Sequence, residues 1–429
     1  MMNLYIYPQN LDIEQLGLTK IERKSIKKLV AILFNKTIYK DNPNNIVLNS
    51  VKLQVALRDY RKYLTVLEEH GVIRLVKEYS AGHHSRTYTF TPEYWHPNLV
   101  FEPIKSKRSM KQSDIPPEYR PCRSFFNDLL QIDVEYALRI TSQNMSERQK
   151  ISKEELNDYK TLSVILINKI HHGDYYFKID KNGRLHTNLT NLPSELRKCI
   201  TYGGNRVVGI DISNTQPLLL IMLCKNEKSL IEILNEVRCP FENQEQLIER
   251  IKKNPYDLAR YEQAVTAGKF YEILGRKYCD KSGVDLGRET IKTAFLTIIN
   301  GERWHFNRTS RKIYKVFCGE FPTIASLLNI LKTKSHKNVS TILQRFESRI
   351  VIKDIANQFI AENPRIPLFT IHDCWYTYES HLEIIEEMVR AYFQNKYEIE
   401  VPLKVERYGT MPQGDALVAQ MTLDTFNIS

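Results

Sequence analysis

The sequence predicts an α+β fold in which a small basic unit of helices and a β-hairpin precedes a larger unit built on an antiparallel sheet. Three observations lead to this prediction. Amphipathic helical patterns fill much of the chain, two short apolar runs lead into an acidic residue, and strand-turn-strand patterns occur over residues 72–90 and 366–378. We expect a front domain with a basic linker over residues 1–110, a mostly helical region with the first strands over 111–205, and the core over 206–429.

Charge and cysteine content limit the partners and the compartment. The 429 residues carry a formal net charge of +11, and residues 1–120 hold 19 Lys and Arg against 12 Asp and Glu, so most of the excess lies at the front. This favours a polyanionic partner, nucleic acid before a membrane surface. The seven cysteines form no CxxC pair, and we find no signal peptide or membrane-spanning run. We therefore expect a cytoplasmic protein without a membrane partner.

The front of the chain has the pattern of two helices followed by a hairpin. Residues 18–36 form a helical pattern with a positive polar face, residues 48–70 form a second one, and strands follow over 72–79 and 86–90. This order resembles a winged helix, in which the helix over 51–69 would lie against DNA. The predicted DNA contacts are Lys52, Arg58, Arg61 and Lys62 on the helix, with His83, His84 and Arg86 in the wing. A protein-docking or dimerisation module is the alternative.

The next segments are predicted from composition and periodicity. Residues 97–120 are rich in proline and basic residues, which predicts a linker or an extended arm. Residues 123–180 are predicted to be mostly helical, including Phe125 to Leu138 and Glu154 to Ile170. The dipeptide Asn182-Gly183 then favours a tight turn with Arg184 and His186 on the strand behind it.

An apolar run from Val207 ends at Asp211 and is followed by a turn and an apolar helix. This pattern predicts a buried strand that holds a carboxylate at its end, where it could bind a metal ion. The alternative is that Asp211 only caps the helix, as Asp, Ser and Asn often do.

Two later segments also carry chemically useful residues. The helix predicted over 287–301 places Arg288, Lys292, Phe295 and Ile299 along one side, where two cations one turn apart would suit a polyphosphate. Over residues 366–378, strands flank His372-Asp373 in a hairpin whose tip holds a second carboxylate. If Asp373 lies close to Asp211, repulsion between the two carboxylates would raise the pKa of one of them. Two divalent cations would remove this repulsion. Taken singly, the helix could be an ordinary surface helix and the hairpin an ordinary polar turn.

Together these segments resemble the palm and fingers of family A DNA polymerases, a superfamily that includes the phage-type single-subunit RNA polymerases. The resemblance covers roughly residues 120–415. It implies a right-hand polymerase with an antiparallel palm sheet and helical fingers and thumb. The positions that carry it are, in chain order, Asn182-Gly183-Arg184, Asp211-Ile212-Ser213, Arg288, Lys292, Asn300-Gly301, Phe321-Pro322, Gln344 and His372-Asp373.

The resemblance also implies roles for these residues in extending a primer on a DNA template with nucleoside triphosphates. Asp211, Asp373 and the Ile212 carbonyl would bind two Mg²⁺ ions, for which Mn²⁺ could substitute. Lys292 would donate a proton to pyrophosphate, and His372 would lie beside the primer terminus. The implied nucleotide contacts are Arg288, Lys292, Gln216, Leu296 and Asn300, and the implied nucleic-acid contacts in this unit are Arg184 and Gln344.

Four departures from the family pattern leave the choice of sugar open. Gln216 and Cys374 stand where the DNA polymerases have Glu, Leu296 where Phe is frequent, and Asn300 where Tyr is usual. A DNA polymerase is the leading prediction. An RNA polymerase or primase, which would bring RNA as a partner, is the first alternative, and a non-catalytic replication initiator is the second.

The front residues resemble a winged helix and not a 3′–5′ exonuclease, so we expect no proofreading. Size and architecture suit a replication protein of a plasmid, a phage or another mobile element. The sequence predicts no oligomeric state.

Overall fold

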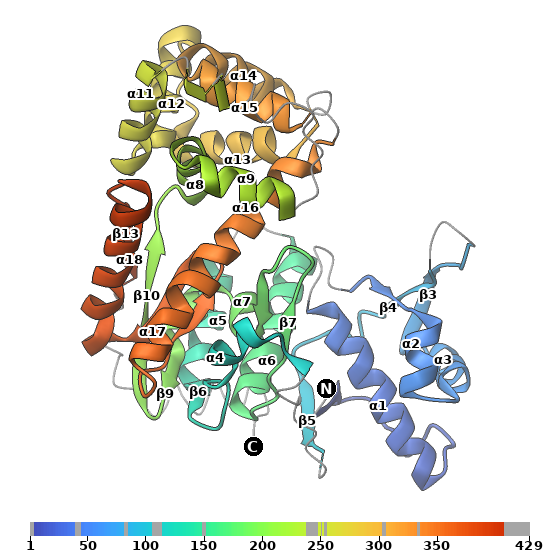
Figure 1. Cartoon of the computed structure of the whole chain (residues 1–429). Helices are drawn as coiled ribbons and strands as arrows, with labels where there is room; N and C mark the ends of the chain where they lie inside the picture. Colours follow the sequence, from blue (N-terminus) through green and yellow to red (C-terminus); the bar gives the residue numbers. More distant parts are fainter. Residues whose placement is uncertain are drawn as a thin grey trace.

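The computed structural model describes residues 4–38, 44–80, 85–104, 114–147, 152–236, 248–249, 251–252, 255–302, 306–332 and 335–406. Three groups of elements can be followed in Figure 1: a front unit (residues 4–104), a central sheet with its flanking helices, and a helical unit (residues 215–348) at one end of that sheet. Within these ranges, we find no helix that combines the length and apolar character needed to cross a bilayer.

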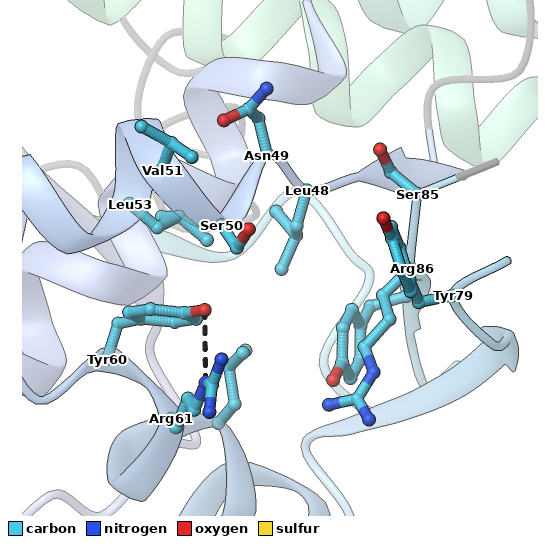
Figure 2. A pocket seen from close by; sticks show the side chains of 12 residues that line it. Leu48, Asn49, Ser50, Val51, Leu53, Tyr60, Arg61, Tyr79, Ser85 and Arg86 are labelled. Atoms are coloured by element: carbon cyan, nitrogen blue, oxygen red, sulfur yellow. Dashed lines mark hydrogen bonds between the residues drawn. The ribbon is translucent and has the colours of Figure 1, made fainter. Parts of the chain in front are cut away.

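The front unit begins and ends in one small sheet and contains a second. Strand β1 (Leu4–Pro8) pairs with β5 (Leu99–Pro103), and β2 (Ile46–Val47), β4 (Thr87–Phe90) and β3 (Ile73–Lys77) pair in that order, all antiparallel. Helix α1 (Lys20–Thr37) confirms the first predicted helix, and a capping box between Thr19 and Glu22 fixes its start. A pocket of about 470 Å³ lies among α2 (Ser50–Ala56), α3 (Tyr60–Glu69) and the end of the β3–β4 hairpin (Figure 2).

The prediction of one helix over residues 48–70 is wrong, because the chain breaks between α2 and α3. Leu57 has an extended backbone, and Asp59 precedes the first residue of α3. Leu53 on α2 and Leu64 on α3 are both buried, so the apolar spacing continues across the break. Periodicity alone could therefore not reveal it.

Two predictions for the next segment are also corrected. The predicted linker over 97–120 includes β5, which completes the first sheet with β1, and the proposed boundary at 110 lies outside the described residues. The helix predicted from Phe125 to Leu138 is interrupted by β6 (Leu130–Ile132), which pairs with β9 (Ile200–Tyr202). Leu130 and Ile132 are buried at the strand spacing of two, a signal too short to separate from a helical one.

The elements between β6 and the central strand are mainly helical. Helix α6 confirms the prediction for Glu154 to Ile170, and β7 with β8 confirms the hairpin around Asn182-Gly183. The elements are η2 (Pro117–Tyr119), α4 (Arg120–Arg123), α5 (Val134–Glu147), α6 (Lys153–His171), β7 (Phe177–Ile179), β8 (Leu185–Thr187), α7 (Asn188–Asn191) and η3 (Ser194–Cys199).

Strand β10 (Asn205–Ile212) is the centre of the largest sheet. It pairs with β12 (Cys374–Tyr378) on one side, and with β9 and β13 (Leu403–Glu406) on the other, while β11 (Phe369–Ile371) pairs with β12. All of these pairings are antiparallel. The structure thus confirms the predicted strand ending near Asp211 and the predicted hairpin over 366–378, and it adds β13, which the sequence analysis missed.

The helical unit packs around a cluster of aromatic rings. Phe295 of α13 lies against Phe270 and Tyr271 of α12 and Phe317 of α14, with ring centroids 4.8–6.0 Å apart. Helix α13 confirms the predicted helix over 287–301 and buries Phe295 and Ile299 in this core. The elements are α8 (Thr215–Lys225), α9 (Glu227–Glu236), α11 (Pro255–Thr266), α12 (Phe270–Ser282), α13 (Gly287–Asn300), α14 (Arg308–Glu320), α15 (Pro322–Leu331) and α16 (Lys337–Ser348).

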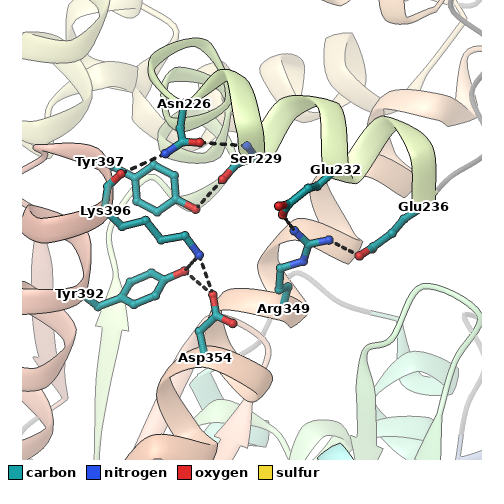
Figure 3. Close-up of polar contacts among 9 residues, drawn as sticks. All are labelled: Asn226, Ser229, Glu232, Glu236, Arg349, Asp354, Tyr392, Lys396 and Tyr397. Carbon is teal, nitrogen blue, oxygen red and sulfur yellow. Dashed lines mark hydrogen bonds and ion pairs between the residues drawn. The ribbon is translucent and has the colours of Figure 1, made fainter.

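A π-helical segment joins the helical unit to the central sheet. This segment, η5 (Arg349–Ala356), continues α16 into α17 (Asn357–Glu362), and η6 (Glu379–His381) leads from β12 into α18 (Leu382–Tyr397). In Figure 3, the Arg349 guanidinium of η5 bridges Glu232 and Glu236 of α9, while Asp354 accepts hydrogen bonds from Tyr392 and Lys396 of α18. Polar contacts on both sides of η5 thus connect α9 to α18.

Gly209 in β10 makes a close approach that a larger residue would prevent. A Cβ atom at this position would lie 2.8 Å from Cζ of Tyr376 and 3.0 Å from Sγ of Cys374. Both neighbours are buried in β12, so they have little room to move. We expect Gly209→Ala to lower the free energy of unfolding by about 1–3 kcal/mol, as measured by chemical denaturation. Gly319→Ala, in helix α14 where the nearest atom is 3.7 Å away, should be neutral or stabilising; an equal loss in both variants would contradict this account.

Candidate active site

Strand β10 places Asp211 between two neighbouring strands at its end. Asp211 lies opposite Cys374 of β12 and opposite Lys404 of β13. Residues directly opposite one another in an antiparallel pair share a face of the sheet. The Asp211 carboxylate therefore has an exposed cation on one side and a buried thiol on the other.

The β11–β12 hairpin brings the second carboxylate to the same place. Its two-residue tip is His372-Asp373, and the backbone N–H of Ile212 donates to the Asp373 carbonyl oxygen at 3.4 Å. Asp373 thus directly precedes Cys374, the residue that lies opposite Asp211. The structure brings together the two carboxylates that lie about 160 residues apart in the sequence.

Backbone strain is concentrated beside these carboxylates. Of the three non-glycine residues with positive φ in the described ranges, two are Asn214 (φ 57°) and His372 (φ 54°). Each costs on the order of 1 kcal/mol and persists only where the surrounding structure holds it. Asn214 is buried, and its side-chain amide has no hydrogen-bond partner in the described part of the chain. Strain and an unpaired buried amide at one place are typical of a functional site.

The surroundings of Asp211 disfavour the negative charge of its carboxylate. Burial raises its pKa to about 7, with further contributions from Asp373 and Glu406, while Lys404 and Lys292 act in the opposite direction. The two lysines therefore do not compensate fully for the buried acidic cluster.

Two residues of this cluster, Thr215 and Glu406, were not predicted from the sequence. The Thr215 hydroxyl lies 2.7 Å from the Ile212 carbonyl oxygen and also contacts the Asp373 carboxylate, and its single proton can serve only one of them at a time. Glu406 of β13 accepts a hydrogen bond from the Tyr376 hydroxyl at 2.5 Å. The position of Thr215, four residues after Asp211, could have indicated its proximity to the site from the sequence. Nothing in the sequence pattern connects Glu406 to Asp211.

The oxygen atoms at this site suit a hard divalent cation. Asp211, Asp373 and the Ile212 carbonyl are oxygen donors, and Mg²⁺ is commonly bound by one or two carboxylates, with water and substrate phosphates completing its coordination. No cluster of three or more His, Cys, Asp or Glu side chains suited to a metal ion occurs among the described residues.

Helix α13 turns its N-terminal half toward the carboxylates. Lys292 is close enough to lower the pKa of Asp211, which places it on the side of the site. Arg288 is exposed, donates to Glu272 at 2.7 Å and to Glu289 at 2.9 Å, and lies 5.5 Å above the Tyr271 ring. Burial raises the pKa of Tyr271, on which the charges of Arg288 and Asp373 act in opposite directions. Tyr271 therefore lies within reach of both.

The other predicted nucleotide contacts occupy different environments. Gln216 is half-buried in the first turn of α8, close to Asp211 in sequence, and Leu296 is half-buried on α13. Asn300 is exposed at the last position of α13, three turns beyond Arg288. No contact of the described residues joins Asn300 to the carboxylates.

A second polar group lies near Asp373, where the β7–β8 turn meets α16. Arg184 donates to Glu347 at 2.8 Å, and Asn182 donates to Gln344 at 2.6 Å. Burial raises the pKa of Glu347 to about 7, with Arg184 opposing and Asp373 reinforcing the shift. Arg184 and Gln344, predicted from separate segments, are thus brought together, and Glu347 is the residue that the sequence analysis missed.

His372 lies near both this polar group and the carboxylates. Its side chain is accessible to solvent, yet many protein atoms surround it. Loss of hydration, followed by the charge of Arg184, lowers its pKa, so the ring is mainly neutral at pH 7. Arg184 Nε and Glu347 Oε1 are buried without a hydrogen-bond partner in the described ranges. These atoms leave hydrogen-bonding capacity for a ligand or for water.

The cations predicted in the front unit lie on its surface. Lys52, Arg58 and Arg61 are exposed on or between α2 and α3, Lys62 forms an ion pair with Glu22 of α1, and Arg86 lies 3.4 Å from Glu78. Burial and the nearby charge of Lys52 lower the pKa of Lys36, which indicates local positive charge. His83 and His84 lie outside the described residues.

The shifted pKa of Asp211 makes stability depend on pH. The group gains protons on folding between pH 3.8 and about 7, so its unfavourable contribution is absent at low pH and grows as the pH rises through this window. We expect Asp211→Asn to stabilise the protein in EDTA by on the order of 2 kcal/mol at pH 8 and by little at pH 4.

Thermal unfolding in EDTA across this pH range measures the effect. Mg²⁺ should stabilise the wild type more than the variant. Asp280→Asn, which replaces an exposed carboxylate on α12, is the matched control and should change stability little at either pH. Equal behaviour of the two variants would contradict the assigned burial of charge at Asp211.

Comparisons with known proteins give similarity to solved structures only. No protein-family model matches the chain, and no curated protein matches it. Among solved structures, the chain is similar to the POL domain of Pol1 from M. smegmatis, determined in complex with DNA primer-template and dNTP. The similarity covers 67% of this chain and 68% of that one, with 12% sequence identity and a TM-score of 0.34. A TM-score of this size does not establish a shared fold.

Proposed function

We propose that this chain is a template-dependent nucleotidyltransferase of the family A polymerase type that extends a primer 3′-hydroxyl group with dNTPs. The observation that carries the proposal is the meeting of Asp211 and Asp373 at the ends of neighbouring antiparallel strands. Burial and mutual repulsion raise the pKa of Asp211 there. A site that brings two carboxylates together against repulsion is suited to divalent cations and a phosphate substrate.

In this proposal the carboxylates position the reacting groups. Asp211 and Asp373, with the Ile212 carbonyl oxygen, would hold two Mg²⁺ ions, which when bound lower the pKa of the attacking hydroxyl group and neutralise the triphosphate. Thr215 fixes the orientation of Asp373 through its hydroxyl. The 3′-oxygen would attack the α-phosphorus, the bond to pyrophosphate would break, and the hydroxyl proton would pass to solvent water.

The cations of α13 and the polar group beside His372 would then have separate tasks. Lys292 would protonate the pyrophosphate as it leaves, and Arg288 would contact the outer phosphates. Arg184, Gln344 and His372 would contact the primer-template, consistent with the unpaired buried atoms of Arg184 and Glu347. Gln216 and Leu296, both half-buried, and Asn300, exposed at the end of α13, would contact the sugar and base of the nucleotide.

A second part of the proposal concerns the front unit, which we infer to be a winged-helix DNA-binding domain. It is supported by the order α1, β2, α2, α3, β3, β4, by the sheet order β2-β4-β3, and by the exposed cations Lys52 and Arg58. The double variant Lys52→Ala/Arg58→Ala should weaken binding to duplex DNA and reduce the slope of log K against log salt by about 2. An unchanged slope would exclude both residues as phosphate contacts.

Primer extension on a defined template in Mg²⁺ tests the enzymatic proposal. The wild type should extend the primer with dNTPs, while Asp211→Ala and Asp373→Ala should not. Extension with rNTPs alone would reassign the sugar preference, a point on which Gln216 bears, and product formed from rNTPs without a primer would indicate a primase. Absence of product with either sugar from a protein that still binds primer-template would exclude catalysis and leave a non-catalytic DNA-binding role.

A further inference from the structure

The pocket in the front unit has a lining that differs from a surface made only to contact phosphates. Its volume is about 470 Å³, within the range of pockets that enclose small organic ligands. Three tyrosine side chains line it, Tyr60 from α3, Tyr79 after β3 and Tyr88 from β4. Tyr60 and Tyr88 are buried, whereas Tyr79 is 65% exposed. An exposed ring at the mouth of a pocket offers a face on which a planar group can stack.

Two guanidinium groups accompany these rings. Figure 2 shows Arg61 and Arg86 on opposite sides of the pocket. Nε of Arg61 donates to the Tyr60 hydroxyl at 3.3 Å, which holds Arg61 at the pocket wall, and Arg86 lies 3.4 Å from the exposed Glu78. An ion pair this exposed is weak, so Arg86 can exchange Glu78 for a phosphate at low cost.

The concave shape of the pocket favours an unpaired nucleotide over a base that is paired in a duplex. The grooves and backbone of a duplex are read by helices and side chains that project outward, and a concave pocket cannot receive a base that stays stacked and paired. An unpaired nucleotide can enter, because its base is free to stack on an aromatic ring while its phosphate meets a guanidinium group.

We propose that this pocket binds one unpaired nucleotide of a single-stranded segment, with the base against Tyr79 and a flanking phosphate between Arg61 and Arg86. The proposal rests on nucleic-acid binding by the front unit and extends it from duplex DNA to the junction of duplex and single strand. Such a site would direct the protein to a primer end, an overhang or an opened duplex. The sugar can be deoxyribose or ribose, because stacking and phosphate contact do not distinguish them.

Fluorescence anisotropy with the full chain tests this proposal without nucleoside triphosphates, so it does not depend on catalysis. The probes are a blunt duplex, the same duplex with a short single-stranded DNA tail, the same duplex with an RNA tail, and the tail oligonucleotide alone. The wild type should bind the tailed duplexes more tightly than the blunt one. Tyr79→Ala should reduce the ratio of tailed to blunt affinity about tenfold, and Arg86→Ala should reduce it as well.

Two control variants separate the pocket from general effects. Tyr79→Phe keeps the ring and should retain the ratio. Arg74→Ala removes an exposed cation from the same hairpin but outside the pocket, so it should weaken tailed and blunt duplexes equally. A 2-aminopurine base in the tail should be quenched on binding to the wild type and much less on binding to Tyr79→Ala.

The outcomes distinguish this proposal from the proposed function. If Tyr79→Ala and Arg86→Ala leave the ratio of affinities unchanged, the pocket does not bind an unpaired nucleotide, whatever the enzymatic result. If the wild type extends primers but shows no preference for a tail, the pocket proposal alone is overturned. If the tail oligonucleotide binds through Tyr79 while no primer is extended, the pocket stands and the nucleotidyltransferase proposal falls.

Discussion

Replacing Asp373 with alanine should lower the rate of primer extension by at least about 1,000-fold while leaving the affinity for primer-template within about twofold. Charge stabilisation of the type assigned to this carboxylate contributes several kcal/mol to a transition state, and each 1.4 kcal/mol is about a factor of ten in rate. Asp373 lies at the tip of the β11–β12 hairpin, and its side chain contacts only Thr215 among the hydrogen bonds of the described residues. Its removal should therefore change the chemistry far more than the fold.

Single-turnover extension and a separate binding measurement check this expectation. Glu379→Ala, which removes an exposed carboxylate just after β12, is the matched control and should retain the rate within about twofold. Thr215→Val removes the hydroxyl that orients Asp373 and should give a smaller loss than Asp373→Ala, because the carboxylate remains. Near-normal extension by Asp373→Ala would contradict the assignment of the active site.

The strands that hold the carboxylates could be predicted because each has a strong local signal. The run from Val207 to Asp211 is apolar and short, and apolar runs lie on both sides of His372-Asp373. That the two acids meet could only be inferred from the resemblance. The pairing of Asp211 with Cys374 is a long-range contact that no local pattern encodes.

The errors have the opposite cause, since they fall where local signals are weak or ambiguous. Strand β6 is three residues long within an apolar segment, and the break between α2 and α3 leaves the apolar spacing intact. Strand β13 contributes Lys404 and Glu406 to the surroundings of Asp211, yet its apolar-polar alternation spans only four residues. Residues that reach the site only through long-range strand pairing could thus not be predicted from the sequence.

The spacing of Arg288 and Lys292 predicted two cations suited to a polyphosphate, and the structure gives them different surroundings. Lys292 lowers the pKa of Asp211 and thus acts directly on the carboxylate site. Arg288 is exposed, and Glu272 and Glu289 already occupy its guanidinium group. A phosphate must displace these carboxylates from Arg288, which reduces the net gain from the new contact.

We therefore expect Lys292→Ala to lower kcat about 100- to 1,000-fold with little change in KM for the nucleotide, because a proton donor acts mainly in the transition state. Arg288→Ala should instead raise KM by about tenfold and leave kcat within a few-fold, as expected when binding in the ground state and the transition state is lost equally. Steady-state extension over a range of nucleotide concentrations measures both parameters. Arg288 is exposed and Lys292 is half-buried, so neither variant should alter the fold.

Two further variants separate charge from proton donation. Lys292→Arg keeps the positive charge but donates a proton poorly, since arginine stays protonated at any accessible pH, so it should recover only part of the lost kcat. Glu272→Gln releases one partner of Arg288 and should lower KM in the wild-type background while having no such effect in Arg288→Ala. If Arg288→Ala reduces kcat more than Lys292→Ala does, the roles of the two cations are reversed. In that case the ion pairs with Glu272 and Glu289 position Arg288 for the nucleotide and do not diminish its contribution to the rate.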